Sequence, residues 1–76
     1  MLRNKILEYL FVRKGSITWY QFRRKLANDN LHDLIDDLRN TLDDLVKDGA
    51  VEVTEIINDV KLYAITKRGS EEFLAK

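Results

Sequence analysis

The chain has 76 residues, no cysteine and a single histidine, His32, and its 13 Lys and Arg residues equal its 13 Asp and Glu residues in number. This length predicts one small domain over residues 1–76, and the composition excludes disulfide frameworks, cysteine zinc sites and thiol nucleophiles. The charge is uneven, with +6 over residues 1–25 (seven cations, one anion) and −8 over residues 26–59 (two cations, ten anions), which fits either a nucleic-acid contact through the basic part or self-association of unlike faces.

The first apolar stripe predicts a helix of about three turns that ends at Gly15, after the cationic pair Arg13 and Lys14. Its members recur at three- and four-residue steps, as Leu2, Ile6, Leu7, Tyr9 and Leu10. Phe11 and Val12 fall partly off this stripe. Two interpretations are open for them: they pack under the C-terminal helix, or they form the seam of a homodimer.

The same segment gives no sign of export or membrane insertion. Glu8 interrupts the apolar run at residues 6–12, and no small-residue cleavage site follows it. No stretch is long enough to cross a bilayer. We therefore expect a cytoplasmic protein with no membrane partner.

A capping box predicts the start of the second helix. The Thr18 hydroxyl can accept a hydrogen bond from the amide of Gln21, whose side chain reaches back to the cap. Ile17 before the box and Phe22 in the first turn are placed to form a hydrophobic staple. Residues 16–17 are expected to form only a short extended link between the two helices.

The longest apolar stripe predicts an N-cap at Asn30, a long amphipathic helix and a terminal glycine at Gly49. Its buried face would comprise Leu31, Leu34, Ile35, Leu38, Leu42 and Leu45. The opposite face is mostly acidic, with Asp33, Asp36, Asp37, Asp43, Asp44 and Asp48, relieved only by Arg39, Asn40 and Lys47. Two helices joined by the polar residues 27–30, the second with the longest stripe, are typical of a helix-turn-helix.

Two alternating segments, residues 50–57 and 61–65, predict a β-hairpin, because Asn58 and Asp59 between them tolerate positive φ. A one-residue change in the loop would move one strand's side chains to the other face. A three-residue loop is favoured over a two-residue loop because it places four apolar residues together on the core face, namely Val51, Val53, Tyr63 and Ile65.

The chain ends in a short helix predicted over residues 67–75. Thr66 is placed to cap its first turn, and Phe73 and Leu74 are expected to return to the body. The elements together predict an α+β domain with a three-helix core, a two-stranded β-hairpin and a short C-terminal helix.

Two runs, LDDLVKDGAV at residues 42–51 and YAITKRG at residues 63–69, resemble winged helix-turn-helix transcriptional regulators of the MarR and PadR type. In those families a leucine-spaced recognition helix ends in glycine, a hairpin wing follows, and its second strand leads into Tyr-x-Leu-Thr-x-x-Gly. The resemblance covers nearly the whole chain, since Ile17, Phe22 and Leu26 also fall at core positions of the family's second helix. It implies a recognition helix in the major groove of DNA and a wing over the flanking backbone.

The candidate DNA-binding residues are exposed cationic, aromatic and amide side chains: Trp19, Tyr20, Arg23, Arg24, Arg39, Asn40, Lys47 and Lys61. At the amino end of the second helix, charge, aromatic edges and the helix dipole can together hold a phosphate. The alternative is that Trp19 is partly core and that these cations pair with acids of the neighbouring helix. Arg39 and Asn40 suit guanine and adenine edges, and Asp can accept from cytosine N4.

The leading hypothesis is a small transcriptional regulator that binds double-stranded DNA as a homodimer, with its seam at Phe11 and Val12. The acidic third helix supports a second hypothesis, a winged helix that docks onto a basic protein partner. A metal site is not expected, because the Asp cluster has neither EF-hand spacing nor a turn glycine. No enzyme activity and no cofactor are expected, because no nucleophile or second titrating group accompanies His32 in a recognisable motif.

Overall fold

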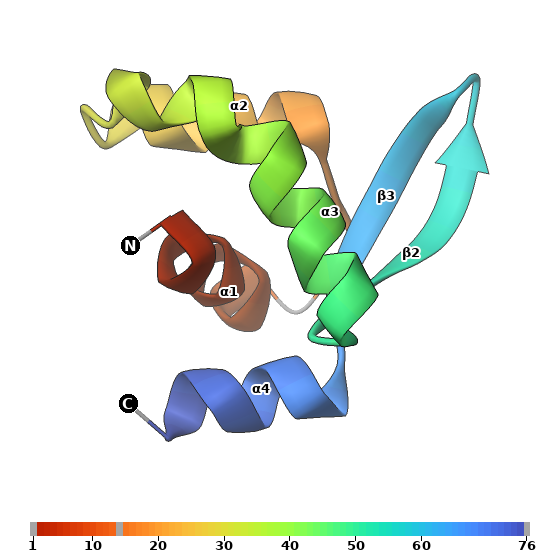
Figure 1. Cartoon of the computed structure of the whole chain (residues 1–76). Coiled ribbons are helices and arrows are strands. Elements are labelled where there is room, and N and C mark those ends of the chain that lie inside the picture. The colour runs from red at the N-terminus through yellow and green to blue at the C-terminus, as the bar shows by residue number, and fades with distance from the viewer. Residues whose placement is uncertain (1, 14, 76) are drawn as a thin grey trace.

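The computed structural model describes residues 2–13 and 15–75, which form four α-helices, one 3₁₀ helix and a three-stranded antiparallel sheet. In chain order the elements are α1 (Leu2–Arg13), β1 (Ile17–Thr18), α2 (Trp19–Asn28), the 3₁₀ helix η1 (His32–Asp37), α3 (Leu38–Asp48), β2 (Val51–Ile57), β3 (Val60–Ile65) and α4 (Lys67–Leu74). Figure 1 shows the β2–β3 hairpin extending away from the helices, with both chain ends on the opposite side. Within the described ranges, no helix is both long enough and apolar enough to cross a membrane.

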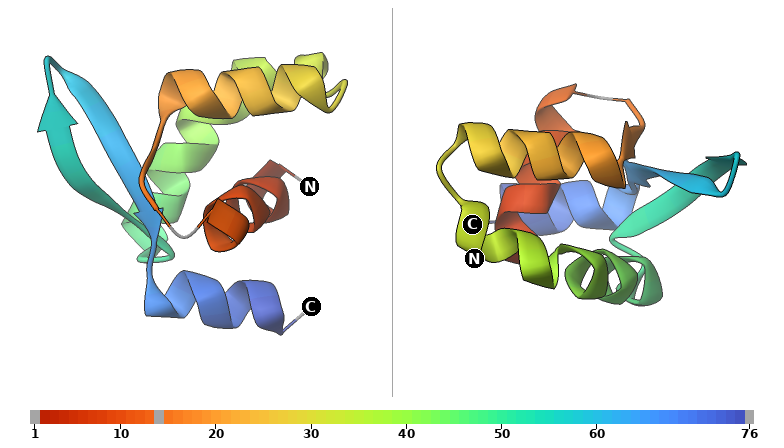
Figure 2. Two further views of the ribbon diagram at one scale, coloured as in Figure 1. Left: turned by 180° about the vertical axis from the view of Figure 1, so that it is seen from behind. Right: turned by 90° about the horizontal axis from the view of Figure 1, so that it is seen from above.

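The core is built from the predicted apolar stripes. The stripe of α1 is confirmed, since Leu2, Ile6, Leu7, Tyr9 and Leu10 are all buried. Helix α1 lies between α2 and α4, and α3 crosses beside it, as both side views show (Figures 1 and 2). Phe22 and Leu26 of α2 and all three leucines of the α3 stripe have no exposed surface, whereas the apolar residues of η1 are only partly buried. Burial of these stripes is the main force that holds the helices together.

The start of α2 agrees with the sequence, but the segment before it does not. The capping box between Thr18 and Gln21 is present in both directions. Ile17, predicted as part of a link, and Thr18, predicted as the N-cap, form a strand that pairs with Tyr63 and Leu62 of β3. The predicted two-stranded sheet is therefore wrong: β2 and β3 form the hairpin, and the sheet has three strands in the order β1-β3-β2. The extended backbone that an N-cap requires also suits a strand, so one segment can serve both roles.

The single helix predicted over residues 30–49 is also wrong, because η1 replaces its first part. Asn30 does not cap a helix at its start; it has a φ of 60° and closes the end of α2. Its amide donates to the carbonyl of Ala27, and the amide of Leu31 donates to that of Leu26, which is a Schellman motif. This closure satisfies two carbonyls of α2, whereas an N-cap at Asn30 would satisfy a single amide of the next helix.

The hairpin loop has two residues rather than the predicted three. Asn58 and Asp59 both have positive φ, as a tight two-residue hairpin turn of the I′ type requires, and residues 57 and 60 pair directly. The expected core face nevertheless forms, because a β-bulge between Val53 and Glu55 supplies the extra residue. The residues predicted on that face are buried or packed against the core: Val51, Val53, Tyr63 and Ile65.

Helix α4 is fixed at its start by Thr66 and along its length by α1. The predicted cap is confirmed, since the Thr66 hydroxyl accepts from the amide of Gly69 and donates to the carbonyl of Gly49, which ends α3 with a φ of 83°. The ring of Phe73 packs on that of Phe11 with centroids 5.0 Å apart, so Phe11 does pack under the C-terminal helix. Leu74 does not return to the body, because its side chain is turned to solvent and the residue is 65% exposed.

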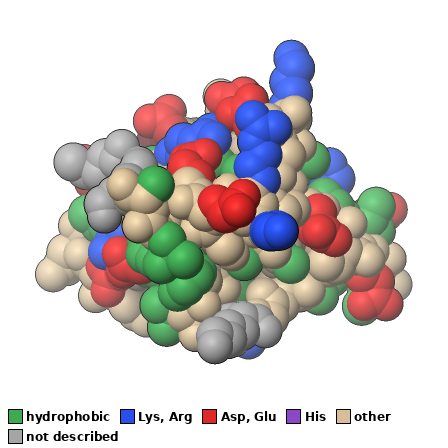
Figure 3. All heavy atoms as spheres, turned by 90° about the horizontal axis from the view of Figure 1, so that it is seen from below, with side chains coloured by type: hydrophobic (Ala, Val, Ile, Leu, Met, Phe, Trp, Pro, Cys, Tyr) green, Lys and Arg blue, Asp and Glu red, His purple; other side chains and the backbone are tan. Residues whose placement is uncertain are grey.

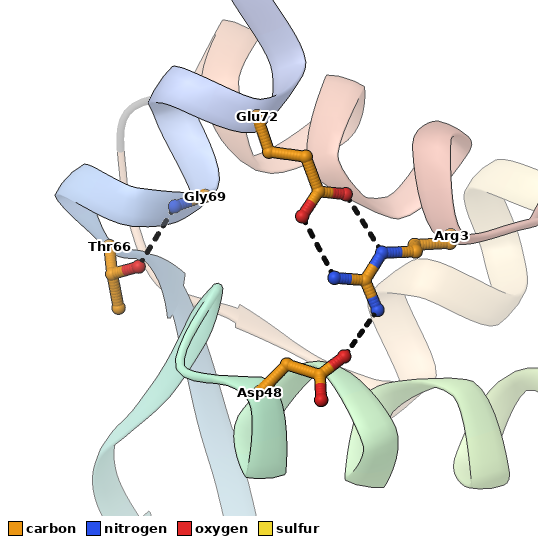
Figure 4. A network of polar contacts seen from close by, with 5 residues as sticks. All are labelled: Arg3, Asp48, Thr66, Gly69 and Glu72. Atoms are coloured by element: carbon orange, nitrogen blue, oxygen red, sulfur yellow. Dashed lines mark hydrogen bonds and ion pairs between the residues drawn. The ribbon is translucent and has the colours of Figure 1, made fainter.

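An arginine that the sequence did not single out joins three helices (Figure 4). Arg3 of α1 makes two hydrogen bonds of 2.8 Å to the carboxylate of Glu72 in α4 and one of 2.8 Å to Asp48 in α3. The hydrogen bonds to Glu72 have the largest effect on the pKa of Arg3 and raise it above its usual range, and the bond to Asp48 raises it further. Burial of the guanidinium group lowers this pKa but offsets only part of the rise. Asp48, at the end of α3, therefore helps to hold the helices together and is not one of the unpaired acids on the outer face of this helix.

Tyr9 provides a test of the contact between α1 and the end of α2. Its hydroxyl donates to the carboxylate of Asp29 at 2.5 Å, and burial, followed by this bond, raises the pKa of Tyr9 above its ordinary value of 10.0. A raised folded-state pKa gives stability that is present below about pH 10 and is lost as the pH rises further. As the pH rises from about 9 to about 11, we expect the free energy of unfolding, measured with urea, to fall less for Tyr9→Phe than for wild type. Tyr20→Phe, at an exposed position, should keep the steeper wild-type loss, and identical pH profiles for all three proteins would contradict the assignment.

Candidate functional site

A hollow of about 220 Å³ lies where the start of α2, one side of α3 and the hairpin meet. The pairing of β1 with β3 brings the first residues of α2 beside the hairpin, which is why three elements distant in sequence converge. The lining residues are Trp19, Tyr20, Arg39, Asp43, Asp59, Val60, Lys61 and Tyr63. Four of the eight residues predicted to bind DNA therefore surround one site: Trp19, Tyr20, Arg39 and Lys61.

The indole of Trp19 organises the cations around it. The guanidinium carbon of Arg39 lies 4.8 Å from the ring centroid of Trp19, and that of Arg23 lies 5.7 Å from the same centroid. The ring of Tyr20 meets the indole edge-on at 5.1 Å. Trp19 is partly buried against the core, as one interpretation expected. Stacking on an aromatic face orients a guanidinium plane while leaving its N–H donors available for another partner.

A second hollow, of about 360 Å³, lies between α2 and η1. Its lining comprises Tyr20, Arg23, Arg24, Ala27, His32 and Ile35. Four of these side chains can donate hydrogen bonds, and two are permanently charged arginines. Tyr20 borders both hollows and is 59% exposed. The two hollows therefore share Tyr20; the second presents Arg23 and Arg24 without an acid in its lining, and the first presents Arg39 and Lys61 alongside Asp43 and Asp59.

The cations of this surface are not neutralised by the neighbouring helix. Among residues 2–13 and 15–75, the ion pairs join Arg3 to Asp48 and Glu72, and Lys5 to Glu8. The interpretation in which Arg23, Arg24 and Lys25 pair with acids of the neighbouring helix is therefore wrong. Two of these cations lie over aromatic rings instead, Arg23 over Trp19 and Lys25 over Tyr9.

Two predicted residues lie outside the hollows. Asn40 and Lys47 are exposed on α3 but line neither hollow, since they project about 80° to 100° further round the helix than Arg39. Sequence reasoning missed Asp43 and Tyr63 as lining residues. Asp43 could have been found, because it follows Arg39 by one helical turn, whereas Tyr63 reaches the site only through strand pairing.

Acidic groups modify the electrostatics of the first hollow. Burial raises the pKa of Tyr63, the negative charge of Asp43 raises it further, and Arg39 partly opposes both effects. The acids of η1 and the outer side of α3 are exposed, namely Asp33, Asp36, Asp37 and Asp44. In the part of the chain that the structure describes, no three His, Cys, Asp or Glu side chains are grouped to hold a metal ion.

The charges, rings and hollows together describe a surface that can bind an anionic polymer and stack on planar groups. Comparison with protein-family models, with curated proteins and with solved structures gave no match.

Proposed function

We propose that the protein is a small DNA-binding regulator with a winged helix-turn-helix fold. In this proposal α2 and α3 form the helix-turn-helix, and the β2–β3 hairpin forms the wing. The order of elements supports it, since α2, the 3₁₀ helix η1 and α3 follow one another and lead into a hairpin that projects beside α3 (Figure 2). The short strand β1, which pairs with the hairpin, fixes the wing relative to α2.

The observation that carries the proposal is the pair of hollows that share Tyr20. Their linings bring together cations from α2, α3 and the wing, alongside Asp43 and Asp59 in the first hollow. Phosphate groups recur along a duplex and supply much of the affinity of DNA-binding proteins. In our proposal, Arg23 and Arg24 contact one strand's backbone, Lys61 contacts backbone beneath the wing, and α3 enters the major groove between them.

A salt series tests this function. Binding of the full chain to a mixed-sequence duplex is measured by fluorescence anisotropy from low to physiological salt. We expect the logarithm of the association constant to fall linearly with the logarithm of salt concentration, with a slope of about −3 or steeper if at least three cations contact phosphates. An absence of binding even at low salt would exclude a phosphate interface.

One observation favours a second candidate function. Apart from Asp48, which pairs with Arg3, the exposed acids of η1 and α3 form no ion pair within the described residues, so this face could dock onto a basic protein. In that case, the salt series would show no DNA binding. Neutralising Asp36 and Asp44 to asparagine would then slow association with the basic partner, whereas a DNA-binding protein would bind non-specific duplex more tightly after the same change.

We also propose that the protein is a homodimer whose seam includes Val12. Val12 and Leu74 are 73% and 65% exposed, and each follows a member of the Phe11–Phe73 ring pair. Figure 3, which views the side of α4, shows hydrophobic side chains gathered among charged ones on this face. A duplex with two symmetric half-sites would bind such a dimer.

Val12→Glu is expected to convert the dimer to a monomer without loss of helix, because an exposed charge opposes association more than it disturbs the core. Sedimentation equilibrium and circular dichroism measure the two effects. Ile56→Glu, at a hairpin position that is 60% exposed, is the matched control and should stay dimeric. Phe11→Glu is less suitable than Val12→Glu, because it would also break the ring contact with Phe73. A wild-type protein that sediments as a monomer at high concentration would contradict the proposed seam.

A further inference from the structure

Arg39 and Asp43 stand one turn apart on α3 and line the same hollow. Oppositely charged residues at this spacing often pair, yet no ion pair joins them in the described structure. Arg39 lies instead over the ring of Trp19 at 4.8 Å. The carboxylate of Asp43 therefore has neither a hydrogen bond nor an ion pair within residues 2–13 and 15–75.

An unpaired carboxylate at a DNA interface is unfavourable beside phosphates, which carry the same charge. It becomes favourable only against a hydrogen-bond donor, because an ionised carboxylate can only accept. In the major groove the exocyclic N4 amino group of cytosine is such a donor, and guanine offers the acceptors O6 and N7 to arginine. A carboxylate on the groove-facing side of α3 would therefore penalise most sequences and tolerate a cytosine.

The spacing of the two side chains suits neighbouring base pairs. Four residues along an α-helix advance about 6 Å, and successive base pairs are about 3.4 Å apart. The axial separation of Arg39 and Asp43 thus corresponds to one or two base-pair steps. The cation–π contact with Trp19 restricts the guanidinium of Arg39, so Arg39 and Asp43 present a donor and an acceptor in a defined relative position.

We propose, building on the DNA-binding function proposed above, that Asp43 determines specificity by accepting a hydrogen bond from cytosine N4 while Arg39 donates to guanine one or two base pairs away. Asp43 then lowers the affinity for sequences that lack a cytosine at this position. The same negative charge that weakens non-specific binding makes the preference for one base stronger.

The experiment begins with selection of preferred duplexes from a random library by the wild-type chain, followed by affinities for every single base-pair change in the preferred site. Replacing the cytosine should weaken wild-type binding at least about fivefold. Asp43→Ala should lose this preference while keeping the preference for guanine. Asp43→Asn should shift the preferred base from cytosine to adenine, because an amide can bond to N6 and N7 of adenine together.

Asp44→Ala is the matched control, since it removes the same charge from the next position of α3 and lines neither hollow. It should keep both base preferences. If Asp43→Ala instead tightens binding to all sequences by one factor and leaves the base preferences unchanged, Asp43 is only a repelling charge and this inference is overturned, while the DNA-binding function stands. Failure of wild type to bind any duplex at low salt would overturn both.

Discussion

The double variant Arg23→Ala, Arg24→Ala is expected to bind duplex DNA more weakly than wild type, whatever the DNA sequence. At about 0.1 M salt, affinity should fall roughly tenfold for each phosphate that the variant no longer contacts. Both arginines line the hollow between α2 and η1, and neither forms an ion pair within the described residues. Their charge is therefore available to phosphates. The measurement is the salt dependence of binding, whose slope should become shallower by about one unit for each such phosphate.

The matched control for this change removes two cations from elsewhere on the surface. Arg13 and Lys67 are exposed at the end of α1 and the start of α4, and neither lines a hollow. Arg13→Ala with Lys67→Ala should keep nearly the wild-type slope. An equal loss of affinity in both double variants would show a diffuse charge effect, and an unchanged slope in the first would remove Arg23 and Arg24 from the interface.

Gly69→Ala is expected to destabilise the fold by about 3 kcal/mol, because an added methyl group has no room. It would overlap the carbonyl oxygen of Ala50 and lie 2.9 Å from both the carbonyl carbon of Ala50 and a side-chain carbon of Ile65. The Ala50 carbonyl is fixed by a hydrogen bond from the amide of Thr66, so it cannot easily move away. Thermal unfolding should show a midpoint lowered by more than about 10 °C for a domain of this size.

Gly15→Ala provides the same chemical change without the clash. Its added methyl group would meet nothing closer than a backbone oxygen of Arg13 at 3.9 Å. We expect this variant to unfold within a few degrees of wild type, since glycine-to-alanine changes in open space have small effects. A similar destabilisation at both positions would mean that the close approach of α4 to residue 50 is not what requires glycine at residue 69.

The features of the fold that depend on local chemistry could be predicted from the sequence. The capping box at Thr18, the glycine end at Gly49 and the cap at Thr66 each involve residues within a few positions of one another. The apolar stripes of α1 and α3 were equally readable, because helical periodicity decides which face is buried. Helical periodicity and residue chemistry together indicated seven of the eight candidate DNA-binding residues, and the place of Lys61 near the tip of the predicted hairpin indicated the eighth.

Local chemistry alone did not decide the structural role of a residue that suits two different roles. Asn30 suits both a helix start and a left-handed helix end, and the structure uses it to close α2. In the hairpin, the predicted core face is correct although the predicted loop length is wrong. The turn is one residue shorter than predicted, and the bulge after Val53 adds one residue to β2, so the register near the core is the same. Such choices depend on how many hydrogen bonds the competing arrangements satisfy across neighbouring elements.

Only the tertiary structure decided which distant residues meet. The strand at residues 17–18 exists because β3 offers it a free edge, and Arg3 gains its two acidic partners because α3 and α4 both pack on α1. The hollow that joins Trp19, Arg39 and Lys61 arises in the same way. The sequence by itself determined the capped starts of α2 and α4, the glycine end of α3 and most of the buried faces, because these follow from contacts within one or two turns. The site depends on contacts between elements, which form only when the apolar stripes are buried together.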